Sequence, residues 1–160
     1  MLGEIETIGL ANRVVLADLE AGLGTLSRLE EGHVDYLLVM AEPSPKALEV
    51  ARRAVDMAHE RKVAHVLVVA NRIRNEADLE KVLRLFPDEE MLVIPEDRVI
   101  EEADKQAKAP IDVAAGSPGI LAFEALVSRL LQPAKPASTA KLDSRLRFLD
   151  TDKEKEKDNK

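Results

Sequence analysis

The chain has 160 residues, enough for one domain with a single hydrophobic core, and 46% of them are hydrophobic against 33% charged. It contains no cysteine, which excludes disulfides, thiolate metal sites and thiol catalysis. Thirty acidic against 23 basic residues give a net charge of −7, and only 2% of the residues are aromatic. This balance argues against a duplex-binding surface and against base-stacking platforms, so we expect no nucleic-acid partner.

The hydropathy pattern predicts neither a membrane span nor a leader. No apolar run reaches the roughly 20 residues that a spanning helix requires, and the N-terminus lacks a secretory pattern. We therefore expect a cytoplasmic chain.

Four short apolar runs, rich in β-branched residues, predict strands. Each is apolar on both faces, as expected of strands buried between two layers of helices. The runs are Arg13–Ala17, Tyr36–Ala41, Val66–Ala70 and Met91–Ile94.

Amphipathic segments between and after these runs predict helices. The clearest begins at Pro45 behind a Ser44 cap, and its apolar residues recur at helical spacing. The expected helices are Pro45–Arg61 (with Leu48, Ala51, Val55 and Ala58 inward), Glu76–Leu85 (Leu79, Val82 and Leu83), Arg98–Lys108, and Pro118–Leu131 (Ile120, Phe123, Leu126, Val127 and Leu130). The alternation predicts an α/β fold with a mostly parallel sheet covered by helices on both faces.

The composition changes after Leu131, so we predict one α/β domain over residues 1–131 and a linker with a charged, disordered tail over 132–160. Within the tail, Leu142, Leu146 and Leu149 lie at i, i+4 and i+7 and predict a short amphipathic helix. Three alternatives exist for such a helix: docking on the domain, docking on a partner, or weak contact with a membrane. Its mixed charge and short length favour docking or disorder over membrane contact.

Ligands of open parallel sheets bind beyond the carboxyl ends of the strands, and the first such loop here is Asp18–Thr25. A carboxylate at that position suits a hydrated Mg²⁺, and the glycines Gly22 and Gly24 allow backbone N–H groups to approach a phosphate. A plain strand-to-helix turn explains the same residues. Gly22-Leu23-Gly24 with Glu42 further on also resembles part of a dinucleotide fingerprint, but Ser27 stands at its third glycine position.

Two further loops carry polar groups at strand ends. Asn71-Arg72 follows the third run, where the Asn amide presents both a donor and an acceptor to a base edge; a turn residue is an equal explanation. Pro95-Glu96-Asp97 follows the fourth run, and its acidic residues alone indicate a helix start. His33, His59 and His65 have no metal-ligand spacing, and no Ser-His-Asp or Gly-x-Ser-x-Gly pattern is present.

In their order and their places at strand ends, these motifs resemble the later two-thirds of the deviant-Walker ATPases of the MinD/ParA group. The resemblance covers about Arg13 to Leu131 and rests on Asp18-x-x-Ala21-Gly22, Glu42-Pro43-Ser44, Val68–Arg72, and Val93–Asp97 followed by Ala103-Asp104. The first two motifs, with Arg28, look closest to the branch that inserts nickel into carbon monoxide dehydrogenase.

The resemblance implies a P-loop NTPase-like fold, ATP and Mg²⁺ as cofactors, and nucleotide-dependent dimers. By similarity, Asp18 is the catalytic Walker-B-type carboxylate near Mg²⁺, which it holds through water, and Gly22 lies by the γ-phosphate. Asn71 contacts the adenine, Arg72 flanks it, and Pro95 and Asp97 belong to the loop that packs against the base.

The sequence departs from that family in one essential part. No Gly-Lys pair occurs anywhere, so the Walker A loop that cradles the phosphates is absent. The family's phosphate-loop strand is central to the sheet, and its loss is expected to leave unpaired strand edges that invite another chain. The cysteine pair of the nickel-insertion branch is also absent.

Three functions remain open. The first is a nucleotide-binding domain, unable to hydrolyse ATP alone, that a homo-oligomer or a partner chain with a phosphate loop completes. The second is a non-catalytic scaffold or regulator derived from this fold. The third is a dinucleotide-binding domain that depends on Glu42.

Overall fold

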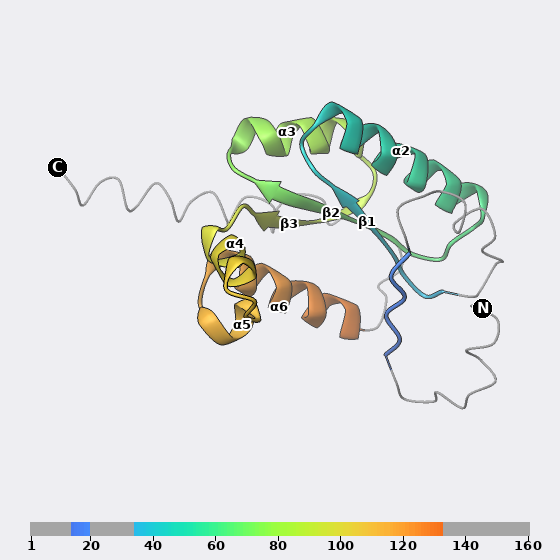
Figure 1. Ribbon diagram of the computed structural model, residues 1–160. Coiled ribbons are helices and arrows are strands. Elements are labelled where there is room, and N and C mark those ends of the chain that lie inside the picture. The colour runs from blue at the N-terminus through green and yellow to red at the C-terminus, as the bar shows by residue number, and fades with distance from the viewer. Residues whose placement is uncertain (1–13, 20–33, 133–160) are drawn as a thin grey trace.

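The computed structural model describes residues 14–19 and 34–132. Strands and helices alternate along this part of the chain, and a run of three helices ends it (Figure 1). In chain order the elements are β1 (Leu37–Ala41), α2 (Pro45–Glu60), β2 (Val66–Ile73), α3 (Glu76–Leu85), β3 (Glu90–Pro95), α4 (Arg98–Lys105), α5 (Pro110–Val113) and α6 (Pro118–Leu131).

The described strands form one parallel sheet in the order β1-β2-β3. Val39 of β1 is aligned with Val68 of β2, which is aligned in turn with Met91 of β3. All three strands therefore run in the same direction and end at one edge, which confirms the predicted parallel α/β architecture.

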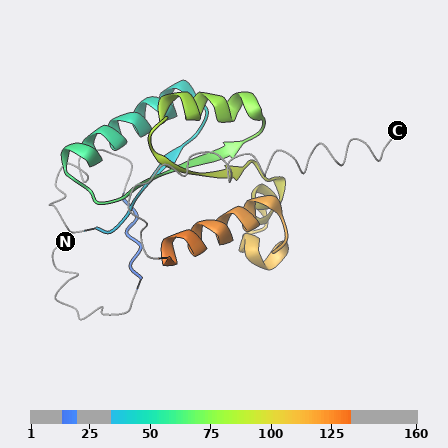
Figure 2. The same ribbon diagram turned by 180° about the vertical axis from the view of Figure 1, so that it is seen from behind.

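Helices cover both faces of the sheet. Because successive strand residues point to opposite faces, Val68 and Ala70 pack beneath α2 and α3, whereas Leu67 and Val69 pack against Leu126 of α6. Figures 1 and 2 show α2 and α3 on one side of the strands and α6 on the other. The apolar character of β2 on both faces follows from this two-sided burial.

The helices begin where their caps predict. The Ser44 hydroxyl accepts a hydrogen bond from the Ala47 N–H at 3.3 Å, with Pro45 in the first turn of α2. The Asn75 side chain accepts one from the Asp78 N–H at 2.9 Å and starts α3. Each cap supplies an acceptor for an N–H group that has no partner within its helix.

The first predicted strand, Arg13–Ala17, is wrong in its described part. Residues 14–17 have no regular secondary structure, and the side chains of Val14 and Leu16 are 78% and 82% exposed. None of the described strands pairs with this segment, and an extended chain gains no ladder hydrogen bonds without a neighbour. Leu19 alone of the segment packs against the main apolar cluster.

The predicted inward face of α6 is only partly correct. Ile120 and Leu126 are buried and Leu130 packs against the sheet, but Phe123 and Val127 are 40% and 54% exposed. A single helix on this face contacts the sheet along one narrow line, so residues beside that line stay in solvent.

Element boundaries otherwise differ from the predictions by a few residues. β2 continues past Ala70 to Ile73, and α4 ends at Lys105 rather than Lys108. The short α5 was not predicted. The linker and tail were predicted over 132–160, and all of this segment except Gln132 lies outside the described residues, so its separation from the domain stays a prediction.

Candidate functional site

The candidate site is the carboxyl edge of the sheet, where β2 and β3 end side by side. Ala70 is paired with Val93, and the next pair is Ile73 with Pro95, so the register of the two strands shifts between Ala70 and Ile73. The Glu96 N–H then donates to the Ile73 carbonyl at 3.0 Å, which ties the two strand ends together. Asn71 and Arg72 lie within this irregular stretch, directly before the Ile73–Pro95 pair.

Arg72 has an unusual backbone conformation. Its φ of 57° lies in the left-handed region, which costs a residue with a Cβ atom roughly 1–2 kcal/mol. Pairing on both sides of Arg72 imposes this conformation, and non-glycine residues held in it are found preferentially at functional sites.

The Arg72 guanidinium joins the strand end to α4. Its Nη2 lies 3.2 Å from Oε1 of Glu96 and 3.5 Å from Oε1 of Glu101. Glu101 lies in α4, and the sequence motifs did not single this residue out. Only its position one helical turn after the Asp97 cap could have indicated that it lies near this loop. With two carboxylates beside it, this cation is suited to stacking on a planar ring more than to binding a phosphate.

Asp97 anchors two helices. Its Oδ1 accepts a hydrogen bond from the Val99 N–H and caps α4, while its Oδ2 accepts one from the Gly119 N–H at the start of α6, each at 2.9 Å. Burial raises the pKa of this carboxyl, but the neighbouring Ser117 hydroxyl and the two N–H groups outweigh it and bring the pKa below its ordinary value. The Ser117 Oγ has no hydrogen bond of good geometry within the described residues, so the N–H groups carry the anchoring.

Gly119 is a second residue that the motifs did not single out. A Cβ atom there would lie 2.7 Å from Cδ1 of Ile100 and 2.9 Å from Oδ2 of Asp97, closer than real contacts allow. Only glycine lets the start of α6 approach α4 this closely. The only indication in the sequence that two elements approach closely at this position was a glycine in the first turn of a predicted helix.

The phosphate half of the predicted site is not brought to this edge. Asp18 is exposed and belongs to the segment without secondary structure, and Gly22 lies outside the described residues. Within residues 14–19 and 34–132, no group of three His, Cys, Asp or Glu side chains could hold a metal ion. Mg²⁺ commonly keeps several waters and binds through one or two carboxylates and substrate phosphates, so Asp18 fits a water-mediated role but does not form a site by itself.

The residues of the predicted base site differ in exposure at this edge. Asn71 is half-buried and offers an amide donor and acceptor, Pro95 is a buried apolar wall, and Arg72 is exposed beside them. An open groove of about 430 Å³ lies elsewhere, between α2 and α3, and neither Asn71 nor Pro95 lines it. This groove therefore does not coincide with the predicted base site.

In the part of the chain that the structure describes, no helix has the length and apolar character to cross a bilayer.

The comparison with solved structures identifies a similar fold. The structure is similar to the MinD cell division protein of Aquifex aeolicus, with a TM-score of 0.53, 20% sequence identity, and coverage of 69% of this chain and 52% of that one. The chain therefore shares the α/β fold of MinD over about half of that chain's length, which confirms the predicted fold resemblance.

A sequence relative is also known. An uncharacterised ATP-binding protein of Methanocaldococcus jannaschii is 34% identical over 65 residues, which is 41% of this chain and 25% of the relative. The chain thus spans about half of the MinD structure, and its match covers a quarter of the archaeal relative. No protein-family profile matches the chain.

Proposed function

We propose that this chain supplies the base-binding half of an ATP site of the MinD/ParA type. In this proposal Asn71 contacts the adenine edge, Arg72 flanks the ring, and Pro95 packs against it. Asp97 contributes by holding the starts of α4 and α6 beside that loop. The observation that carries the proposal is the irregular end of the β2–β3 pair, which holds Arg72 in a left-handed conformation next to Pro95.

The comparisons support the choice of nucleotide. The archaeal relative is described as ATP-binding, and the fold is shared with MinD. When bound, Mg²⁺ would neutralise phosphate charge near Asp18, with Gly22 close to the γ-phosphate. Because phosphoryl transfer depends on positioned charge and the sequence has no Gly-Lys pair, we propose that the chain alone does not hydrolyse ATP.

The open edge of β1 supports completion by another polypeptide segment. β1 pairs only with β2 among the described strands, and Met40 on its α6-side face is 50% exposed. An edge strand with an uncovered apolar side chain is a template for a further strand. We propose that a phosphate loop reaches the site on such a strand, from a second copy or from a partner chain.

Calorimetric titration with ATP and Mg²⁺, and separately with adenosine, tests this function. We expect weak binding of both ligands, because the chain lacks the Walker A loop that would bind the phosphates. Asn71→Ala should reduce the affinity for both about tenfold, the equivalent of about one good hydrogen bond. Arg84→Ala, a change on the exposed surface of α3, is the matched control and should leave the affinity unchanged.

Two other results would change the assignment. Adenosine binding that is unaffected by Asn71→Ala would remove the proposed base site. No nucleotide binding by the folded chain, together with capture of a partner that survives Asp18→Ala, would favour the second candidate, a scaffold that uses the open β1 edge. That edge is the specific observation in favour of a scaffold.

A further inference from the structure

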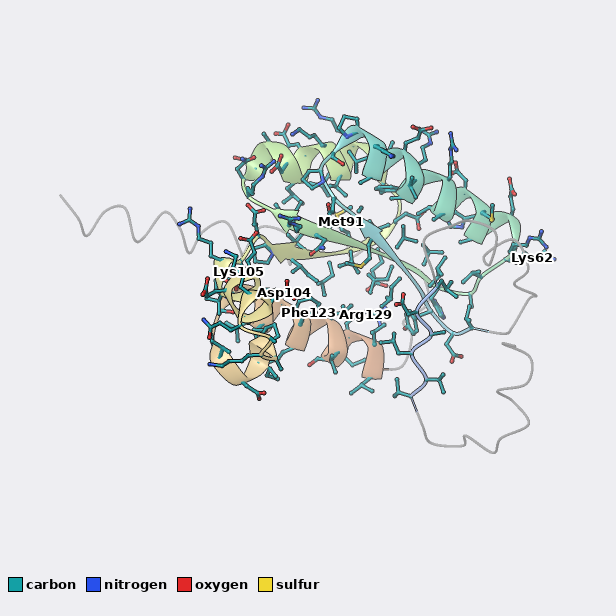
Figure 3. The ribbon with its side chains drawn as sticks, in the orientation of Figure 1. Lys62, Met91, Asp104, Lys105, Phe123 and Arg129 are labelled. Carbon is teal, nitrogen blue, oxygen red and sulfur yellow. The ribbon has the colours of Figure 1, made fainter. Side chains whose placement is uncertain are left out.

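An apolar stripe on α6 has no cover within the described residues. Phe123, Val127 and Leu131 lie four residues apart and therefore on one side of the helix, with exposed fractions of 40%, 54% and 64%. They lie directly beside the line of Leu126 and Leu130, which packs against the sheet. Figure 3 shows Phe123 on α6, below the sheet in that view.

The C-terminal end of α6 is well defined. Gln132 has φ −81° and ψ 146°, an extended conformation typical of a residue before proline, and Pro133 follows it. α6 therefore ends at Leu131, with Gln132 as its C-cap. Residues 132–139 are eight in number and span up to about 26 Å when extended, longer than the roughly 21 Å of the 14-residue α6.

The sequence beyond this linker carries a matching apolar face. Leu142, Leu146 and Leu149 recur at i, i+4 and i+7, the spacing of one side of a helix. If a helix with these leucines is placed antiparallel to α6, Leu142 lies opposite Leu131, Leu146 opposite Val127 and Leu149 opposite Phe123. Arg145 borders this leucine face, and the exposed Glu124 borders the α6 stripe, so the flanking charges are opposite in sign.

We infer that residues 141–150 dock as a short antiparallel helix on the Phe123–Val127–Leu131 stripe of α6, forming an αα-hairpin through the Pro-rich linker. Without this contact, the α6 stripe exposes apolar area to water, which is unfavourable. A helix of ten residues is also too short to remain folded by itself. Burial of each against the other removes both costs. The docked segment adds a second helix to the α6 side of the sheet.

Disulfide trapping tests this contact, because the chain has no cysteine of its own. We expect Val127→Cys with Leu146→Cys to form an intramolecular disulfide under mild oxidation at low protein concentration. Val50→Cys with Leu146→Cys is the matched control, since Val50 is similarly exposed, at 53%, but lies on α2 across the sheet. At least a tenfold slower reaction is expected for the control pair.

Thiol labelling provides a second readout that does not require a crosslink. With Val127→Cys alone, changing Leu142, Leu146 and Leu149 together to Asp should raise the labelling rate of Cys at 127 several-fold, while the rate at Val50→Cys stays constant. Circular dichroism of each variant verifies that the domain remains folded.

Three results would overturn the inference. Equal rates for both cysteine pairs would mean that the tail does not prefer α6. A disulfide-linked dimer whose share falls on dilution would mean that the stripe contacts a second copy. Flotation with anionic vesicles that depends on the three leucines, without trapping in solution, would assign the segment to a membrane surface.

Discussion

The carboxylate of Asp97 accepts a hydrogen bond from the backbone N–H of Gly119 at 2.9 Å, across 22 positions of sequence. The same side chain caps α4 through the Val99 N–H. One carboxylate therefore serves the positive ends of two helices, each stabilised by a nearby negative charge. Through this contact the loop after β3 and the start of α6 form a single unit at the edge of the sheet.

Gly119→Ala should destabilise the domain by about 1–3 kcal/mol, because the new methyl group would overlap Ile100 and the Asp97 carboxylate. Urea unfolding measures the change. Gly116→Ala is the matched control, since a Cβ atom there meets nothing within 4 Å. Equal effects of the two substitutions would mean that α6 does not need its close approach to α4.

The free energy of unfolding of the domain depends on pH through Asp78. Hydrogen bonds from Lys81 (Nζ to Oδ1, 2.9 Å) and Arg74 (Nε to Oδ2, 2.8 Å), acting against burial, lower the pKa of Asp78 to about 2 from its ordinary value of 3.8. Above about pH 5 the carboxylate is ionised in both the folded and the unfolded chain, and its contribution to the free energy of unfolding is complete. As the pH falls toward about 2, the unfolded chain takes up the proton first, so the free energy of unfolding decreases.

The comparison of wild type with Asp78→Asn checks this dependence. The urea midpoint of the wild type should fall more steeply between pH 4 and pH 2 than that of the variant, which lacks the titrating group. Parallel profiles would show that the Asp78 pKa is not lowered on folding.

Ala107→Gly should stabilise the domain by about 1 kcal/mol. Ala107 follows α4 with φ 53°, a left-handed conformation that costs a residue with a Cβ atom, whereas glycine adopts it freely. The hydrogen bond from the Lys108 N–H to the Ala103 carbonyl, at 2.9 Å, marks this as a helix-ending turn that fixes the conformation. Thermal unfolding measures the gain.

Ala115→Gly is the control for that substitution. Ala115 is exposed and its φ is not positive, so glycine there only increases the entropy of the unfolded chain and should slightly lower the stability. A loss of stability in both variants would contradict the expected relief at Ala107.

Arg129→Lys should destabilise the domain by about 1–2 kcal/mol. The guanidinium binds Glu90 through two nitrogens, one of them 2.7 Å from Oε2, and donates to the Tyr36 hydroxyl at 3.1 Å. Figure 3 labels Arg129 on α6. A lysine cannot reproduce this two-point contact while also reaching Tyr36.

Arg53→Lys provides the comparison, because Arg53 pairs with Glu49 on the exposed surface of α2 and such pairs contribute little. Its urea midpoint should stay within experimental error of the wild type. If Arg129→Lys behaves in the same way, the contact between α6 and the start of β3 does not contribute to stability.

Much of the fold follows from local signals in the sequence. Ser44 and Asp97 cap helices at their predicted positions, and the runs Val66–Ala70 and Met91–Ile94 lie within β2 and β3. These signals act over a few residues through backbone hydrogen bonds and hydrophobic period, so no distant part of the chain is needed to interpret them. The ends of β2 and β3 also lie at one edge of the sheet as expected, because parallel strands run in the same direction.

Other features depend on neighbours that sequence patterns do not reveal. Val14–Ala17 has the composition of a strand but forms none beside the described sheet, and Val127 has helical spacing but stays exposed. The sequence by itself determined β1, β2 and β3, the longer helices, their order and the loops that carry polar groups. Only the tertiary structure decided the left-handed turn at Arg72 and the Asp97–Gly119 contact, because burial and strain depend on which residues meet across the fold.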